Sequence, residues 1–127
     1  MEAEMATLND RVLDNGLTVL DTEANKIVIT SQEATTYTEA NATYALGDST
    51  SLSIGAPADR AGGGREVTVA AITDGSVTAT GTATHYAIID TANTRLLATS
   101  TLTASQAVTS GNTFTLSSVA IGIPDPA

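Results

Sequence analysis

The sequence predicts a mainly β protein, a β-sandwich or a compact barrel, with a short N-terminal helix. From residue 66 onward, β-branched runs recur about every ten residues and alternate with turn-forming residues, a spacing typical of sandwiches and barrels. Threonine is the commonest residue, with 23 copies among 127, and its branched side chain suits the exposed face of a strand. Because this length suits one domain of ordinary size, we expect a single β-rich domain over residues 1–127.

The N-terminal residues predict an arm followed by the helix. Residues 1–7 are acidic and contain no apolar side chains other than methionine and alanine, so we interpret them as an N-terminal arm. Thr7 is a suitable N-cap, and apolar residues then recur at helical spacing, which predicts a helix over residues 8–20. Gly16 lowers helix stability by about 1 kcal/mol relative to alanine, so we expect the helix to weaken or end near this residue.

The β region is expected over residues 26–121. Its first strand is the β-branched run of residues 26–30, which turn formers bound on both sides. Tyr37 and Tyr44 then lie seven residues apart, which is about two helical turns. Two interpretations stay open here: both rings face one side of a short helix, or they anchor a loop at two places.

The second half of the chain carries the clearest strand and turn patterns. Asp74-Gly75 lies between two alternating runs and predicts a type I′ hairpin turn. Pro124 and Pro126 cannot pair inside a sheet, so we expect residues 122–127 to form an extended C-terminal tail. The expected strands are 51–54, 66–73, 76–82, 84–90, 94–101, 106–108 and 113–121, with further turns at 92–93 and 110–112.

The core can be predicted from strand parity, because alternate side chains of a strand share one face. On each expected strand the apolar residues that we choose lie two apart or stand alone, so each set faces one side. The predicted buried residues are Ile27, Ile29, Val67, Val69, Val77, Ile89, Leu96, Phe114 and Leu116.

The charge of the chain limits its partners. Fourteen acidic residues against five basic ones give a formal net charge of −9. Such a chain gains no counterion release from nucleic acid and is repelled by anionic membranes, so we expect neither partner.

The absence of cysteine excludes disulfides, thiolate metal ligands and cysteine nucleophiles. No signal peptide is visible, so we expect the chain to be made in a cytoplasm.

No residue pattern predicts catalysis, a cofactor or a metal site, so we expect a protein that is not an enzyme. His85 is the only histidine and has no nucleophile or acid at a suitable spacing, so a structural hydrogen bond is its expected role. Gly62-Gly63-Gly64 precedes a strand, whereas a dinucleotide-binding glycine loop precedes a helix. The aspartates at strand ends lack the spacing of a calcium loop and are explained as turn residues.

Arg60 and Arg65 bracket the glycine-rich loop and are two of only five basic residues. One interpretation is that this loop docks against an acidic partner surface. The other is a local ion pair with Asp59 or Glu66, which contributes little if it is exposed. Both interpretations stay open.

Six segments of the chain carry a family resemblance: residues 35–40 (TTYTEA), 53–60 (SIGAPADR), 63–69 (GGREVTV), 74–87 (DGSVTATGTATHYA), 109–116 (TSGNTFTL) and 121–125 (IGIPD). In these segments the sequence resembles a family of small proteins encoded in the structural-gene regions of tailed bacteriophages. The resemblance extends over residues 8–127, and the family commonly has Trp where Tyr86 stands here.

The resemblance implies a structural component of the virion, made in the host cytoplasm. Within that class we expect a capsid decoration (cement) protein that binds the outside of the head, with the major capsid protein or other virion subunits as partners and a trimer as the oligomer. A tail, neck or fibre-associated component and a surface carbohydrate-binding module are the alternatives. The expected partner contacts are Arg60, Arg65, Pro124, Asp125 and Pro126.

Overall fold

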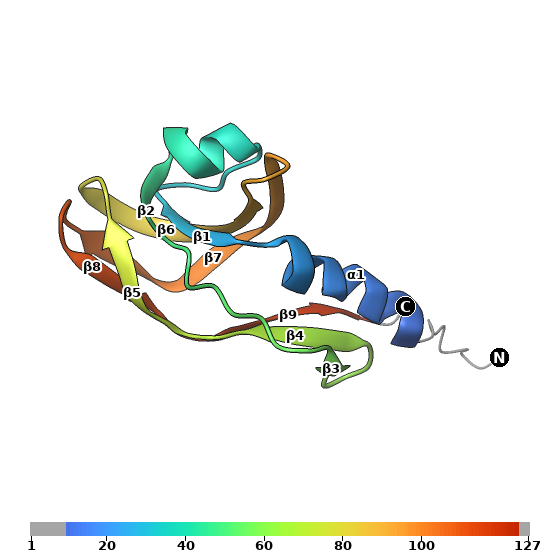
Figure 1. Cartoon of the computed structure of the whole chain (residues 1–127). Helices are drawn as coiled ribbons and strands as arrows, with labels where there is room; N and C mark the ends of the chain where they lie inside the picture. The colour runs from blue at the N-terminus through green and yellow to red at the C-terminus, as the bar shows by residue number, and fades with distance from the viewer. Residues whose placement is uncertain (1–9, 125–127) are drawn as a thin grey trace. The chain divides into compact units, whose positions relative to one another are not determined.

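The computed structural model of the protein describes residues 10–124, with side chains from residue 14 onward. The expected arm over residues 1–7 therefore lies outside the described residues. The chain divides into two compact units, whose elements are labelled in Figure 1. Unit 1 comprises Met1–Thr22, Ser53–Ala70 and Ser118–Ala127, and unit 2 comprises Glu23–Leu52 and Ala71–Ser117.

Strands dominate the secondary structure. Strands make up about half of residues 10–124, and the longest helix described there, α1 (Asp10–Glu23), is N-terminal. The predicted fold class, mainly β with a short N-terminal helix, is confirmed. No helix among residues 10–124 is both long enough and apolar enough to cross a membrane.

Unit 2 contains an antiparallel sheet of six strands that curls into a half-barrel (Figure 1). Gln106 of β7 donates a side-chain hydrogen bond of 3.0 Å to the Thr115 carbonyl of β8, which links the two outer strands of the sheet. This curl agrees with the barrel alternative of the sequence prediction. The order across the sheet is β7-β6-β1-β2-β5-β8, with bounds β1 Lys26–Thr30, β2 Ala45–Ser49, β5 Ile72–Val77, β6 Gly81–Asp90, β7 Arg95–Val108 and β8 Thr113–Leu116.

The central strand β1 is buried on both faces. Ile27 lies opposite Ile88 of β6, and Val28 lies opposite Ala87, so the two pairs project from opposite faces of the sheet. All four side chains are at most 2% exposed. A strand that is buried on both faces must have other elements packed on both sides of the sheet. Strand parity predicts only one buried face, so it does not reveal the second packing element.

A short helical segment covers one of these faces. It is the π-helix η1 (Glu39–Thr43), and both Tyr37 and Tyr44 pack against the buried cluster beneath it, which includes Val28 and Ile89. The helical interpretation is thus confirmed in part: a short helical segment lies between the two tyrosines and both rings pack on one cluster, but both residues lie just outside the bounds of η1. Glu39 and the preceding threonines hold the start of the segment as in a capping box: the Glu39 amide donates to the Thr36 hydroxyl at 3.1 Å, and a Glu39 carboxylate oxygen accepts the Thr35 amide at 2.8 Å.

The predicted core is confirmed at eight of its nine positions, and the ninth, Leu96, is half-buried. Leu96 packs against the cluster under η1, at the outer strand β7. The prediction assigned one buried face to each strand and so left out Val28 and Ile88, which are buried because β1 and β6 are covered on both sides.

The predicted hairpin turn at Asp74-Gly75 is wrong, because both residues lie inside strand β5. β5 pairs with β2 on one side and with β8 on the other, and Gly75 lies opposite Phe114. A Cβ at position 75 would overlap Cε1 and Cζ of the Phe114 ring, which is 3% exposed. Glycine at position 75 therefore allows close packing within a strand. The Asp-Gly pair alone does not distinguish this packing role from a role in a turn.

Unit 1 combines α1 with a three-stranded antiparallel sheet of order β3-β4-β9. The strands are β3 (Ala58–Asp59), β4 (Arg65–Val69) and β9 (Val119–Ile123). The helix is described from Asp10 and continues through Gly16 to Glu23, three residues beyond its predicted end, whereas residues 8 and 9 of the predicted helix lie outside the described residues. Gly16 faces the sheet: a Cβ built on it would lie 3.4 Å from Cδ1 of Ile123, an ordinary van der Waals contact, so this part of the helix packs against β9.

The C-terminal segment also differs from the prediction. The expected strand 113–121 is two strands, β8 and β9, which belong to different units. β9 extends to Ile123, so residues 122 and 123 of the expected tail pair with β4 instead. Pro124 follows as an exposed residue, and Asp125 and Pro126 lie outside the described residues.

The turn between β6 and β7 is organised by the buried carboxylate of Asp90, which is 1% exposed. One oxygen accepts the amides of Ala92 at 3.0 Å and Asn93 at 3.3 Å, and the other accepts the Asn93 side-chain amide at 2.8 Å. The Asn93 side-chain hydrogen bond, followed by these backbone hydrogen bonds and the charge of Arg95, holds the pKa of Asp90 below its ordinary value. The predicted turn at residues 92–93 is confirmed.

We predict that Gly75→Ala destabilises unit 2 by about 1–3 kcal/mol, because the new methyl group must displace a buried aromatic ring. Gly55→Ala is the matched control: its nearest contact would be the Thr68 carbonyl at 3.9 Å, so its free energy of unfolding should be unchanged or slightly higher. Urea-induced unfolding measures both. Equal stability of the two variants would contradict the packing of Phe114 on Gly75.

We predict that acid weakens the protein partly through Asp90. A carboxylate with a lowered folded-state pKa adds stability above its unfolded value of about 3.9, and this stability is lost as the pH falls through the lower folded value. Asp90→Asn should therefore lose less stability than the wild type between about pH 6 and about pH 3. Asn93→Ala, which removes the largest cause of the shift, should reduce the slope in the same direction. Parallel slopes for all three proteins would contradict this account.

Candidate interaction surface on unit 1

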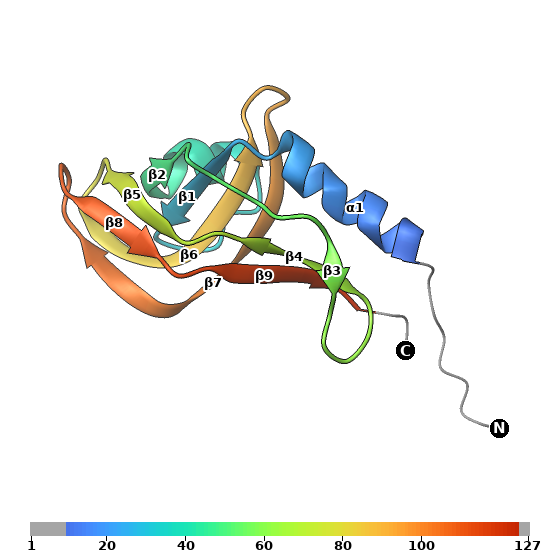
Figure 2. The ribbon, with the colours of Figure 1, turned by 60° about the horizontal axis from the view of Figure 1, so that its bottom comes forward.

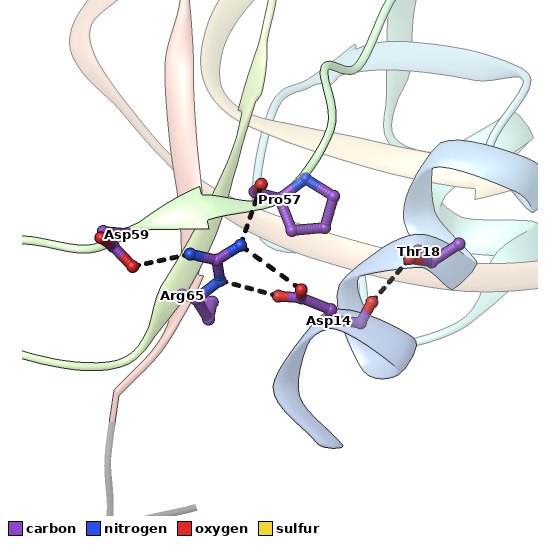
Figure 3. Close-up of polar contacts among 5 residues, drawn as sticks. All are labelled: Asp14, Thr18, Pro57, Asp59 and Arg65. Carbon is purple, nitrogen blue, oxygen red and sulfur yellow. Dashed lines mark hydrogen bonds and ion pairs between the residues drawn. The ribbon is translucent and has the colours of Figure 1, made fainter. Parts of the chain in front are cut away.

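The predicted contact residue Arg65 lies at the centre of a polar cluster in unit 1 (Figure 3). Its Nε donates to Asp14 at 2.9 Å and its Nη2 donates to the other oxygen of the same carboxylate at 3.4 Å. Its Nη1 donates to Asp59 at 2.6 Å, and Nη2 also reaches the Pro57 carbonyl at 3.3 Å. The guanidinium thus joins α1 to β3 through two carboxylates and one backbone oxygen.

This geometry supports the ion-pair interpretation of Arg65, and Asp59 is one of the two partners that it proposed. The second partner, Asp14, lies 51 residues away in α1 and was not predicted. The side chains of Arg65 and Asp14 are 18% and 32% exposed, so their ion pair forms in a partly dehydrated setting, where it counts for more than an exposed pair. The Asp59 side chain is 90% exposed, so its pair with Arg65 contributes little. A role as a partner contact stays a prediction; in the structure the Arg65 guanidinium bridges α1 and β3.

The glycine-rich loop has a defined backbone conformation. Gly62, Gly63 and Gly64 have φ values of 88°, 106° and 97°, which L side chains rarely adopt, so glycine is required at all three positions. The Arg60 amide donates to the Gly64 carbonyl at 3.1 Å, and the Gly63 amide donates to the Arg60 carbonyl at 3.1 Å. The loop closes on itself as a tight turn between β3 and β4.

Arg60 bonds to the backbone of this turn, whereas Arg65 bonds mainly to carboxylates. Its Nη1 donates to the Gly63 carbonyl at 3.0 Å and to the Ala61 carbonyl at 3.4 Å, and no carboxylate among the described residues pairs with it. Its side chain lies across β9, because a Cβ built on Gly122 would come within 2.9 Å of Cδ and 3.2 Å of Nε of Arg60. A positive charge is thereby fixed beside β9 without an acidic partner in residues 10–124.

The strand β9 is the outer strand of its sheet. β4 pairs with one of its sides, and no strand of the described residues pairs with the other (Figure 2). Residues 117–124 around it carry no charge. Val119, Ile121 and Ile123 are half-buried, whereas Ala120 and Gly122 are exposed. An uncharged, β-branched outer strand is the kind of edge that pairs with another chain. The sequence did not predict this edge, because it required knowing which strands neighbour one another.

His85 and the four aromatic residues, which the sequence analysis also considered, make contacts that the fold explains. His85 is half-buried, and its Nδ1 lies 2.8 Å from the Thr84 hydroxyl, which agrees with a structural hydrogen bond. Tyr86 and Phe114 are buried, and the other two tyrosines pack on the cluster under η1, so the aromatic residues form no exposed platform of the kind that binds a glycan. Within residues 10–124, no three histidine or carboxylate side chains gather where a metal ion could bind.

Comparisons with known proteins add no relatives: the chain matches no protein-family model, no curated protein and no solved structure.

We predict that Arg65→Met lowers the free energy of unfolding of unit 1 by about 1.5–3 kcal/mol, because it removes charged hydrogen bonds and leaves the Asp14 carboxylate partly dehydrated. Arg95→Met is the matched control, since the side chains of its ion pair with Glu23 are 58% and 34% exposed and such pairs contribute about 1 kcal/mol or less. Chemical unfolding measures both variants. If Arg65→Met costs no more than Arg95→Met, the cluster does not hold the unit together.

Proposed function

We propose that the protein is a non-enzymatic structural subunit of a bacteriophage particle, and specifically a capsid decoration protein that binds the outside of the head. The phage assignment comes from the sequence resemblance. The single observation that supports a structural, surface-binding role is the uncharged edge of β9 with Arg60 fixed beside it. Such an edge offers backbone amides and carbonyls to a strand from a neighbouring protein.

The charge distribution supports attachment through unit 1. With a net charge of −9, most faces of the protein repel other acidic surfaces, including those of its own copies. Residues 117–124 contain no charged side chain, and Arg60 adds a positive one next to them. Contacts through this region therefore avoid like-charge repulsion. We propose the major capsid protein and further copies of this chain as the partners, with a trimer as the oligomer.

We predict that purified virions of the phage that encodes this chain contain it in hundreds of copies, near the number of capsid subunits or a simple fraction of it. Quantitative densitometry of virion proteins gives this number, with the major capsid protein of the same particles as the internal reference. Purified protein added to heads that lack it should co-sediment with them.

A tail or neck component gives a different result. Only a small number of copies would be present, and they would leave with the tails when tails are detached from heads. Either finding would contradict the decoration role and favour the tail, neck or fibre assignment instead.

A further inference from the structure

We propose that the N-terminal residues 1–7 of one copy pair as an antiparallel strand with the outer edge of β9 of another copy, where Glu2 or Glu4 forms an ion pair with Arg60. This proposal builds on the oligomer of the proposed function. Its test uses isolated protein, so its failure is distinguishable from failure of the decoration role.

The acceptor is the outer edge of β9, whose far side has no partner strand among the described residues. Natural sheets usually protect such an edge with a charge, a proline or a bulge. Here the paired stretch with β4 is a regular register of five residues, from Arg65 opposite Ile123 to Val69 opposite Val119, and the strand itself carries no charge and no proline. Pro124 marks only its end. The edge is therefore regular and long enough to accept another strand.

The two faces of β9 have different chemistry, and they specify what an added strand must look like. Val119, Ile121 and Ile123 project to the face that contacts α1, as the closeness of Ile123 to Gly16 shows. Ala120 and Gly122 project to the opposite face, where the Arg60 side chain lies. A matching strand therefore alternates apolar residues on the first face with acidic residues on the second.

The N-terminal segment of this chain has that alternation. Met1, Ala3 and Met5 alternate with Glu2 and Glu4. In an extended conformation the apolar residues share one face and the two glutamates share the other. The apolar side continues the β-branched face of β9, and the glutamates face the arginine that lacks a carboxylate partner within residues 10–124.

The placement of α1 favours pairing between copies over pairing within one copy. Gly16 is next to Ile123, at the C-terminal end of β9, and Asp10, the first described residue of the helix, comes six residues before Gly16, about 9 Å farther along the axis. To reach β9 of its own copy, the arm would have to reverse direction, which uses several residues, and would then run parallel to β9. An arm that extends to another copy spans up to about 30 Å and can form the antiparallel ladder, which is the more stable arrangement.

Size-exclusion chromatography with light scattering, over a range of concentrations, tests the proposal on the full chain. We expect oligomers, and we expect Arg60→Glu, or deletion of residues 1–6, to weaken self-association by about tenfold or more. Arg95→Glu is the matched control, because it makes the same charge change in unit 2 and should leave self-association unchanged. Circular dichroism verifies that each variant is folded.

A charge reversal gives the decisive result. The double variant Glu2→Arg with Glu4→Arg should fail to assemble alone, and so should Arg60→Glu, whereas a chain that carries all three changes should assemble again. Three outcomes would overturn the proposal: a full chain that stays monomeric at all concentrations, oligomers that persist without residues 1–6, or no rescue in the triple variant. Cross-linking of the N-terminal segment to β9 within a monomer would also overturn it.

Discussion

The ion pair of Arg65 with both carboxylate oxygens of Asp14, which joins α1 to the sheet, is the interaction on which our account of unit 1 depends. The sheet of this unit has strands of only two, five and five residues, and so small a sheet is not stable without a covering element. Arg65 lies on the face that α1 covers and bonds to a carboxylate of the helix. It therefore fixes where the helix lies on the sheet as well as adding stability.

This arrangement determines which surfaces of unit 1 are left for other proteins. The helix covers the face that carries Ile121 and Ile123, while the opposite face carries the small residues Ala120 and Gly122. Arg65 bonds to the carboxylates of Asp14 and Asp59, whereas Arg60 lies against Gly122 on the opposite face and bonds only to backbone carbonyls among the described residues. Two arginines that look equivalent in the sequence thus have different roles, one within the unit and one beside the open edge of β9.

What could be predicted from the sequence was whatever depends on local periodicity. The buried residues of β4 and β8 follow strand parity, and the spacing of Tyr37 and Tyr44 allowed the helical segment that the structure contains. The clearest error concerns a glycine. Asp74-Gly75 has the composition of a turn, yet Gly75 lies within β5 and makes room for the Phe114 ring, so a tertiary contact outweighed the local preference. The C-terminal error has a similar origin, because residues 122 and 123 pair with β4, a partner that local composition does not reveal.

The candidate surface was predictable only in part. Arg60 and Arg65 were identified because basic residues are scarce in this chain and stand together around the loop. The contact between Arg65 and Asp14 joins residues 51 apart, and the open edge of β9 follows from the order of strands in the sheet, so neither leaves a local pattern in the sequence.

Amide hydrogen exchange along β9 tests the central claim, that this edge is where other subunits attach, most directly. The measurement compares dilute protein with the assembled particle, and the β4 amides that bond to β9 serve as the internal reference because they are already paired in the free protein. The account predicts that β9 amides not bonded to β4 exchange quickly in the free protein and at least about tenfold more slowly after assembly. Unchanged exchange of these amides in the assembled particle would contradict it.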